Sequence, residues 1–159
     1  MLIERTIIID SLDQQFANLH ETSCRLIVST PHDLLYHDPR TTKAETASHS
    51  VGAYVLKSAG VVEQTFGGIT SNLWDDPFEW TLPENLSTPA RVIDYLNEVD
   101  ETRRRAFVSF RSDADLLKSI ATPAEDMRPL VSVLLDTFAR ATIYQGRAQA
   151  LAKGFSRSA

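Results

Sequence analysis

Apolar side chains recur at spacings of three and four residues along most of this chain, and this periodicity limits the fold more than any other feature. In the first segment the series contains Leu12, Phe16, Leu19 and Ile27. Steps of three and four place side chains on one face of an α-helix. Pro31 follows, and a proline moves the residue before it out of helical geometry. We therefore predict a long first helix that buries this face and ends before Pro31.

Two further helices are marked by residues typical of helix starts. The second is expected to open at Ser48–Ser50, because hydroxyl side chains cap helix N-termini. We expect Gly67-Gly68 to loosen its end. The third opens in STPARV, where Ser87 or Thr88 serves as the cap and a proline fits the first turn.

The C-terminal third of the chain predicts a short helix and a long one. Residues Asp113 to Ile120 are expected to form the short helix, and Pro129 to lie in the first turn of the last helix. The buried stripe of that helix runs from Leu130 through Ala141 to Leu151. Four amphipathic helices of this length with no strand pattern predict an all-α, up-and-down-like four-helix bundle, with residues 1–159 forming one domain.

Composition excludes several classes of function. The chain carries 16 Lys and Arg against 21 Asp and Glu, a net charge of −5, which argues against a nucleic-acid partner. No apolar run approaches the roughly 20 residues that cross a bilayer, so no membrane partner is expected. The start MLIERTIIIDS is a poor signal peptide. We expect a cytoplasmic protein.

Three segments resemble the DinB/YfiT-like family of bacterial four-helix proteins. SVGAYVLKSAGVVE (50–63) is similar to the family's S-I-x-x-x-L-x-H-x-A segment. LPENLSTPARVIDYLNEVDETRRR (82–105) is similar to its loop and third helix. DTFARATIYQGR (136–147) lies along H-x-x-N-H-x-T-x-H-R-G-Q, with Thr142 and Gly146 matching and Gln145 and Arg147 in swapped order. The resemblance covers nearly the whole chain and implies the family's helical bundle.

The resemblance also implies a divalent metal held by three histidines, one on the second helix and two on the last. In this sequence those positions are Lys57, Arg140 and Tyr144. Lys and Arg are cations at neutral pH and Tyr is a poor ligand unless deprotonated. We therefore expect no metal and no cofactor at this position. A further family histidine becomes Asp136, one turn before Arg140.

These replacements suggest a site for a different ligand. Asp136, Arg140, Tyr144 and Lys57 are candidates for an ionic cluster with a positive excess, because buried charges need partners. Either a carboxylate such as Glu63 completes the cluster or the pocket accepts a small anionic ligand. The alternative interpretation is a flank of solvated charges beside the apolar stripe.

Arg103 is the remaining candidate for the site. It falls in the middle of the third apolar stripe, between Val99 and Ala106, so its guanidinium must pair or extend to solvent. Its side chain is expected to reach the interior near Tyr144 or Asp136. Structural pairing is the first interpretation and ligand anchoring the second.

Other chemistry-bearing residues follow no recognised motif. His20, His32, His37 and His49 have no zinc-site spacing, although a relocated site that uses His37 and His49 stays open. Cys24 stands alone, which excludes an internal disulfide, and His20 lies one helical turn before it. A helical cysteine of this kind is usually an inert small residue. Three aromatic residues in the loop 71–87 are expected to cover the end of the bundle, or to line a ligand mouth or dimer contact; they are Trp74, Phe78 and Trp80.

Three functions remain open at this stage. The first is a metal-free DinB-like protein that binds a small anion or has a structural role. The second, implied by the resemblance, is a metal-dependent hydrolase or thiol S-transferase that uses other ligands. The third is a homodimeric interaction module.

Overall fold

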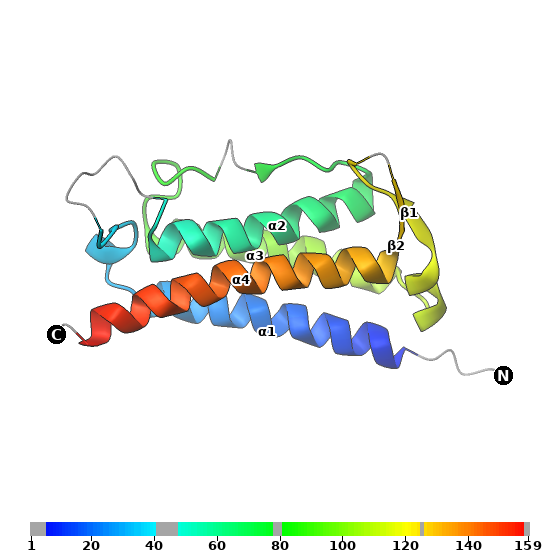
Figure 1. The fold of residues 1–159 in the computed structure, drawn as a ribbon, viewed down its shortest axis with the longest axis horizontal. Coiled ribbons are helices and arrows are strands. Elements are labelled where there is room, and N and C mark those ends of the chain that lie inside the picture. The colour runs from blue at the N-terminus through cyan, green and yellow to red at the C-terminus, as the bar shows by residue number, and fades with distance from the viewer. Residues whose placement is uncertain (1–5, 41–47, 78–80, 125, 158–159) are drawn as a thin grey trace.

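The computed structural model describes residues 6–40, 48–77, 81–124 and 126–157, and the all-α four-helix bundle predicted from sequence is confirmed. The helices are α1 (Ile7–Ser29), α2 (Val51–Ser71), α3 (Pro89–Ser109) and α4 (Leu130–Arg157). They lie side by side along the long axis of the molecule (Figure 1). None of the helices in the described ranges combines the length and apolar character needed to cross a membrane.

The order of helix directions differs from the simple up-and-down expectation. Helices α2 and α3 run in the same direction, and residues 72–77 and 81–88, which we call the return segment, lie along the bundle between the end of α2 and the start of α3 (Figure 1). Two hydrogen bonds fix the start of α3 near the end of α1: Tyr36 Oη donates to Leu86 O at 2.6 Å, and His32 Nε2 lies 3.2 Å from Ser87 O. The return segment runs along α2 (Figure 1).

Side-chain caps explain where the helices begin. Ser50 Oγ accepts a hydrogen bond from Ala53 N, and Thr88 Oγ1 accepts one from Arg91 N. Both caps agree with the sequence-based expectation. The start of α1 is capped from a distance, because the Asp113 carboxylate accepts hydrogen bonds from the first turn at 3.0–3.1 Å. Each cap satisfies backbone donors that the helix itself leaves unpaired.

Two helix boundaries differ from the prediction. Helix α2 continues through Gly67-Gly68 and ends at Ser71, where the C-cap residue Asn72 has a left-handed backbone (φ 55°) that closes the last turn. Gly68 is needed for packing instead, because a Cβ at this position would lie 2.2 Å from the Trp74 ring. Pro129 is the last residue of a strand, and α4 begins one residue later.

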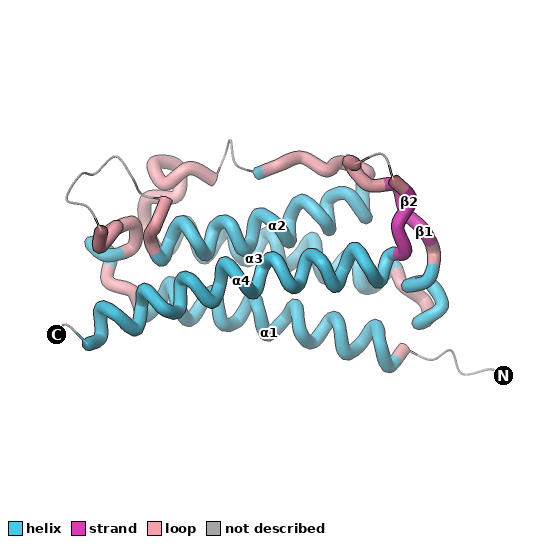
Figure 2. Tube along the Cα trace, in the orientation of Figure 1, coloured by secondary structure: helices cyan, strands magenta, loops and turns pink. Residues whose placement is uncertain are grey.

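The segment before α4 forms a small hairpin that the sequence pattern did not indicate. A 3₁₀ helix, η3 (Asp113–Leu117), takes the place of the longer predicted helix. It is followed by the antiparallel strands β1 (Ser119–Ala121) and β2 (Met127–Pro129), shown in Figure 2. Strands of three residues are too short to show an alternating pattern. A second 3₁₀ helix, η1 (His32–Leu34), follows α1.

The core contains aromatic rings from all four helices. Phe16 contacts Phe66 and Phe138 edge to face at centroid distances of 5.1 and 5.4 Å, and Phe107 is tilted against Phe16 at 6.0 Å. Edge-to-face contacts are favourable beyond simple apolar burial. One aromatic layer therefore holds the four helices together.

Arg103 is buried within this core and is paired. Its Nη2 lies 2.7 Å from Asp100 Oδ1 one turn earlier on α3, and its Nη1 contacts the Asp13 carboxylate on α1. Asp100 also pairs with the largely exposed Arg104 at 2.8 Å. The predicted pairing of Arg103 is confirmed, but its partners are Asp100 and Asp13 on α3 and α1, and not residues near Tyr144 or Asp136 on α4. The network joins α1 to α3.

Replacing Arg103 is expected to destabilise the fold far more than replacing Arg104. Arg103→Met leaves the buried Asp100 without its buried partner and should lower the free energy of unfolding by about 3 kcal/mol. Arg104→Met removes an exposed partner of the same carboxylate and should cost under about 1 kcal/mol. Urea unfolding of both variants measures the difference. Equal losses would show that burial does not govern this network.

Candidate functional site

A groove of about 570 Å³ lies between α2, α4 and the segment that returns from α2 to α3. Its volume falls in the usual range for small-molecule sites. The helices form one wall, and residues 76–77 and 81–84 contribute the other. Pro77 lies directly over Gly60, where a Cβ would be only 3.1 Å from the proline ring. A small residue on α2 therefore lets the return segment approach closely.

Three of the predicted site residues line this groove together. Lys57 projects from α2, and Arg140 and Tyr144 project from consecutive turns of α4. The contact between the helices explains the alignment, because Ser58 Oγ donates a 2.8 Å hydrogen bond to Ala141 O in the core. Lys57 and Arg140 precede Ser58 and Ala141 in sequence, so this contact places them at the same level on the groove side.

The other predicted site residues lie elsewhere. Asp136 is exposed and its carboxylate is 3.7 Å from Arg128 Nη1, outside the groove. Arg103 is held between α1 and α3. Glu63 accepts a 2.5 Å hydrogen bond from Tyr95 Oη. Burial, followed by the negative charge of Glu63, raises the pKa of Tyr95 far above its usual range. Neither acid completes a cluster with Lys57 and Arg140.

Two residues that sequence reasoning did not single out extend the site. The ring of Tyr54 lies nearly parallel to that of Tyr144, 6.5 Å away. The guanidinium of Arg147 lies 5.8 and 5.7 Å from the two rings, and Lys57 Nζ lies 5.5 Å from the Tyr54 ring. His49 Nδ1 and the Tyr54 hydroxyl are joined by a 2.7 Å hydrogen bond. Spacings of three residues, Tyr54 to Lys57 and Tyr144 to Arg147, are the signal that could have revealed these contacts.

The groove has cations on the helical wall and carboxylates on the facing wall. Lys57 and Arg140 are both exposed, and neither makes an ion pair with another described residue. Asp76 and Glu84 line the wall formed by the return segment. Apolar side chains, including Leu56 and Val61 of α2, also line the groove. This arrangement favours a charged ligand with an apolar part.

The residues at the three aligned positions do not fit a divalent metal. Two are cationic donors without a lone pair to offer, and the third is a phenol. In the described ranges, no group of three or more His, Cys, Asp and Glu side chains could hold a metal ion. The described histidines have other contacts: His32 with Ser87 O, His37 with the Phe155 ring and His49 with Tyr54.

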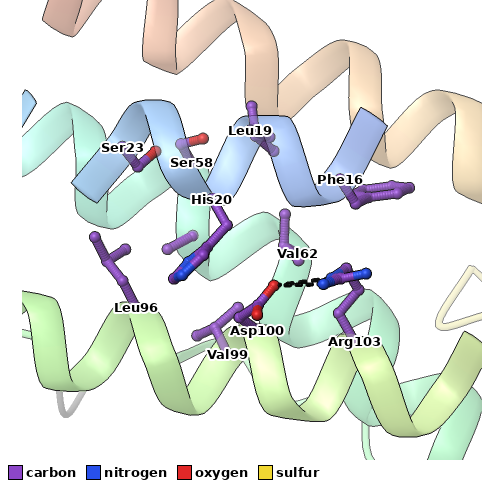
Figure 3. Close-up of a pocket in the computed structure, with 11 residues that line it drawn as sticks. Phe16, Leu19, His20, Ser23, Ser58, Val62, Leu96, Val99, Asp100 and Arg103 are labelled. Atoms are coloured by element: carbon purple, nitrogen blue, oxygen red, sulfur yellow. Dashed lines mark hydrogen bonds and ion pairs between the residues drawn. The ribbon is translucent and has the colours of Figure 1, made fainter. Parts of the chain in front are cut away.

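A second, smaller cavity lies inside the bundle between α1, α2 and α3 (Figure 3). Its volume of about 30 Å³ has room for a single water molecule. His20 and Ser23 point toward it from α1, and the paired Asp100 and Arg103 lie on α3. Its size and the paired charges suit a structural polar site.

Cys24 lies near His20, which lines this cavity, but its thiol is not activated. Its Sγ is 3.7 Å from His20 Nε2. Burial, followed by the negative charges of Asp100 and Glu21, raises the pKa of the Cys24 thiol. A nucleophilic cysteine needs the opposite shift. Of the loop aromatics, Trp74 packs on Gly68 as described above, and Phe78 and Trp80 lie outside the described residues.

Comparisons with known proteins add no identification. No protein-family profile matches the chain, and neither a curated protein nor a solved structure is significantly similar to it.

The Cys24 thiol is expected to react slowly with iodoacetamide at neutral pH. Its raised pKa leaves a smaller thiolate fraction than an ordinary cysteine has, so the rate should keep rising above the usual thiol pKa of about 8.5. A pH–rate profile measured by mass spectrometry tests this, with the urea-unfolded chain as the control. A rate that is already constant at pH 7 would contradict the assignment.

Proposed function

We propose that this protein is a DinB-like helical bundle in which the family's metal position is replaced by a metal-free groove that binds a small anion. The observation that carries the proposal is the alignment of Lys57 and Arg140 on one wall without an ion pair to another described residue. The groove lies between α2 and α4, the two helices that carry the histidines in the resembling family.

The chemistry of the helical wall suits a carboxylate or a phosphate. Lysine offers a point charge and arginine a planar fork of donors, and together they neutralise and orient an anion. The Tyr144 hydroxyl on the same wall is a further hydrogen-bond donor. Arg147 adds positive charge beside both tyrosine rings. The helical wall thus presents cations where a metal site needs neutral or anionic donors.

A carboxylate or phosphate is expected to stabilise the protein through Lys57 and Arg140. At ten times its Kd, the anion should raise the Tm by about 3–6 °C. Lys57→Met and Arg140→Met should each remove most of this shift, whereas Lys153→Met and Arg157→Met, which remove exposed charges farther along α4, should not. Thermal shift measurements with acetate, citrate and inorganic phosphate test this.

Measuring the metal content of the protein tests the metal-dependent alternative to this proposal. Stoichiometric zinc or nickel in purified tag-free protein, lost on substitution of His37 or His49, would favour a metal-dependent hydrolase or thiol S-transferase. Stabilisation by anions that persists in both groove variants would place the anion elsewhere.

A homodimeric interaction module is the second candidate, and it is favoured by the outer face of α4. Leu135 and Ile143 are 54% and 57% exposed, and Ala139 lies between them on the same row. Residues four apart form a continuous ridge on a helix. Such a ridge can pack against the same ridge of a second copy around a twofold axis.

If this ridge is the dimer contact, the chain should sediment at twice 17.7 kDa. Leu135→Lys combined with Ile143→Lys should return the mass to that of one chain, because the two charges would repel across the interface. Analytical ultracentrifugation gives the masses. A monomeric parent protein would remove the dimer candidate.

A further inference from the structure

The facing walls of the groove carry opposite charges, and this limits the ligand more closely than the cations do alone. Lys57 and Arg140 stand on the helical wall, and Asp76 and Glu84 on the wall of the return segment. Lys57, Arg140 and Glu84 make no ion pair with another described residue. The two signs of charge therefore remain on separate sides of the groove.

A simple anion would satisfy only one of these walls. It would neutralise the helical wall while bringing its negative charge toward the carboxylates opposite, where like charges repel. A ligand with a cationic group as well would place each of its charges against the opposite sign. Charge complementarity of this kind selects one ligand over another more than it raises affinity in general.

The space between the walls requires an apolar body. Leu56 and Val61 from α2 face Pro77 and Leu82 from the return segment. These side chains favour apolar side chains on the ligand, because a polar side chain would lose its hydration here without compensation. Because each residue of extended chain spans about 3.3–3.6 Å, a dipeptide separates its end charges by about 7 Å. A free amino acid holds its two charges closer together than a dipeptide does.

We propose that the groove binds a zwitterion whose charges stand at the two ends of an apolar body, which is the chemistry of a short apolar peptide with free termini. The peptide carboxylate lies against Lys57 and Arg140, and its ammonium lies against Glu84. This inference rests on the proposed function, because it uses the same anion contacts.

Three matched probes separate the two charges: dileucine, N-acetyl-dileucine without the cation, and dileucinamide without the anion. Calorimetric titration at low salt should give the lowest Kd for dileucine. Blocking either end should weaken binding about tenfold or more, as for loss of a charge-assisted hydrogen bond.

Glu84→Gln tests the ammonium contact without changing the shape of an exposed side chain. It should weaken dileucine about tenfold and leave N-acetyl-dileucine unchanged or tighter. Glu101→Gln is the matched control, because Glu101 is an exposed acid on α3 and does not line the groove. It should change neither Kd.

The outcomes separate this inference from the proposed function. Equal binding of dileucine and N-acetyl-dileucine, with no effect of Glu84→Gln, would overturn the zwitterion and keep the anion site. Binding of dileucinamide alone would overturn both. Absence of binding by all three probes would overturn the peptide chemistry, while stabilisation by acetate or phosphate would still report on the anion site separately.

Discussion

The alignment of the helices depends on the ion pairs that the buried guanidinium of Arg103 makes. Arg103 stands in the middle of an apolar helix face, where a charge is stable only when it is paired. Asp100 supplies a partner on α3 itself, and Asp13 supplies one on α1. Because the second contact crosses between helices, it fixes the level at which α3 meets α1. Apolar side chains in place of all the paired charges would pack there without specifying that level, whereas removing Arg103 alone leaves Asp100 buried without its buried partner.

Buried hydrogen bonds also fix the alignment of α4 with α1 and α2. Thr65 and Thr137 share a 2.6 Å hydrogen bond, and Gln145 Nε2 donates to Leu19 O and Ser23 Oγ at 2.7 and 2.8 Å. Each of these buried polar groups is satisfied at one alignment of the helices and would be unsatisfied after a shift of one turn. The polar contacts thereby hold the groove residues of α2 and α4 at a common level. A substitution of one of these core residues would therefore shift the groove residues relative to one another, even where no groove residue is substituted.

The helices could be predicted from sequence, because their apolar pattern is repeated over about 20 residues. The caps could be predicted as well, because capping depends on local chemistry. Sequence reasoning missed the hairpin before α4, whose strands are too short to carry a pattern. It also missed the parallel course of α2 and α3, because the direction of a long connection is decided by distant contacts such as Tyr36 with Leu86. Lys57, Arg140 and Tyr144 were named from a resemblance, whereas the acids that face them became visible only once the return segment was placed. Arg103 was correctly expected to pair, but its partner on α1 lies 90 residues away in sequence.

Exchanging imidazoles for cations at an aligned position changes what a bundle groove can do. A metal site requires neutral or anionic donors that converge on one point, and its chemistry comes from the ion they hold. Lys57 and Arg140 instead bring the positive charge themselves, on flexible side chains that need not converge. Such a wall can bind an anion but cannot polarise a water molecule as a metal ion does. Glu84 lines the facing wall, so the groove is positive on one side and negative on the other, which a central metal ion would not provide. Under the proposed function, the groove discriminates ligands by the distance between their charges.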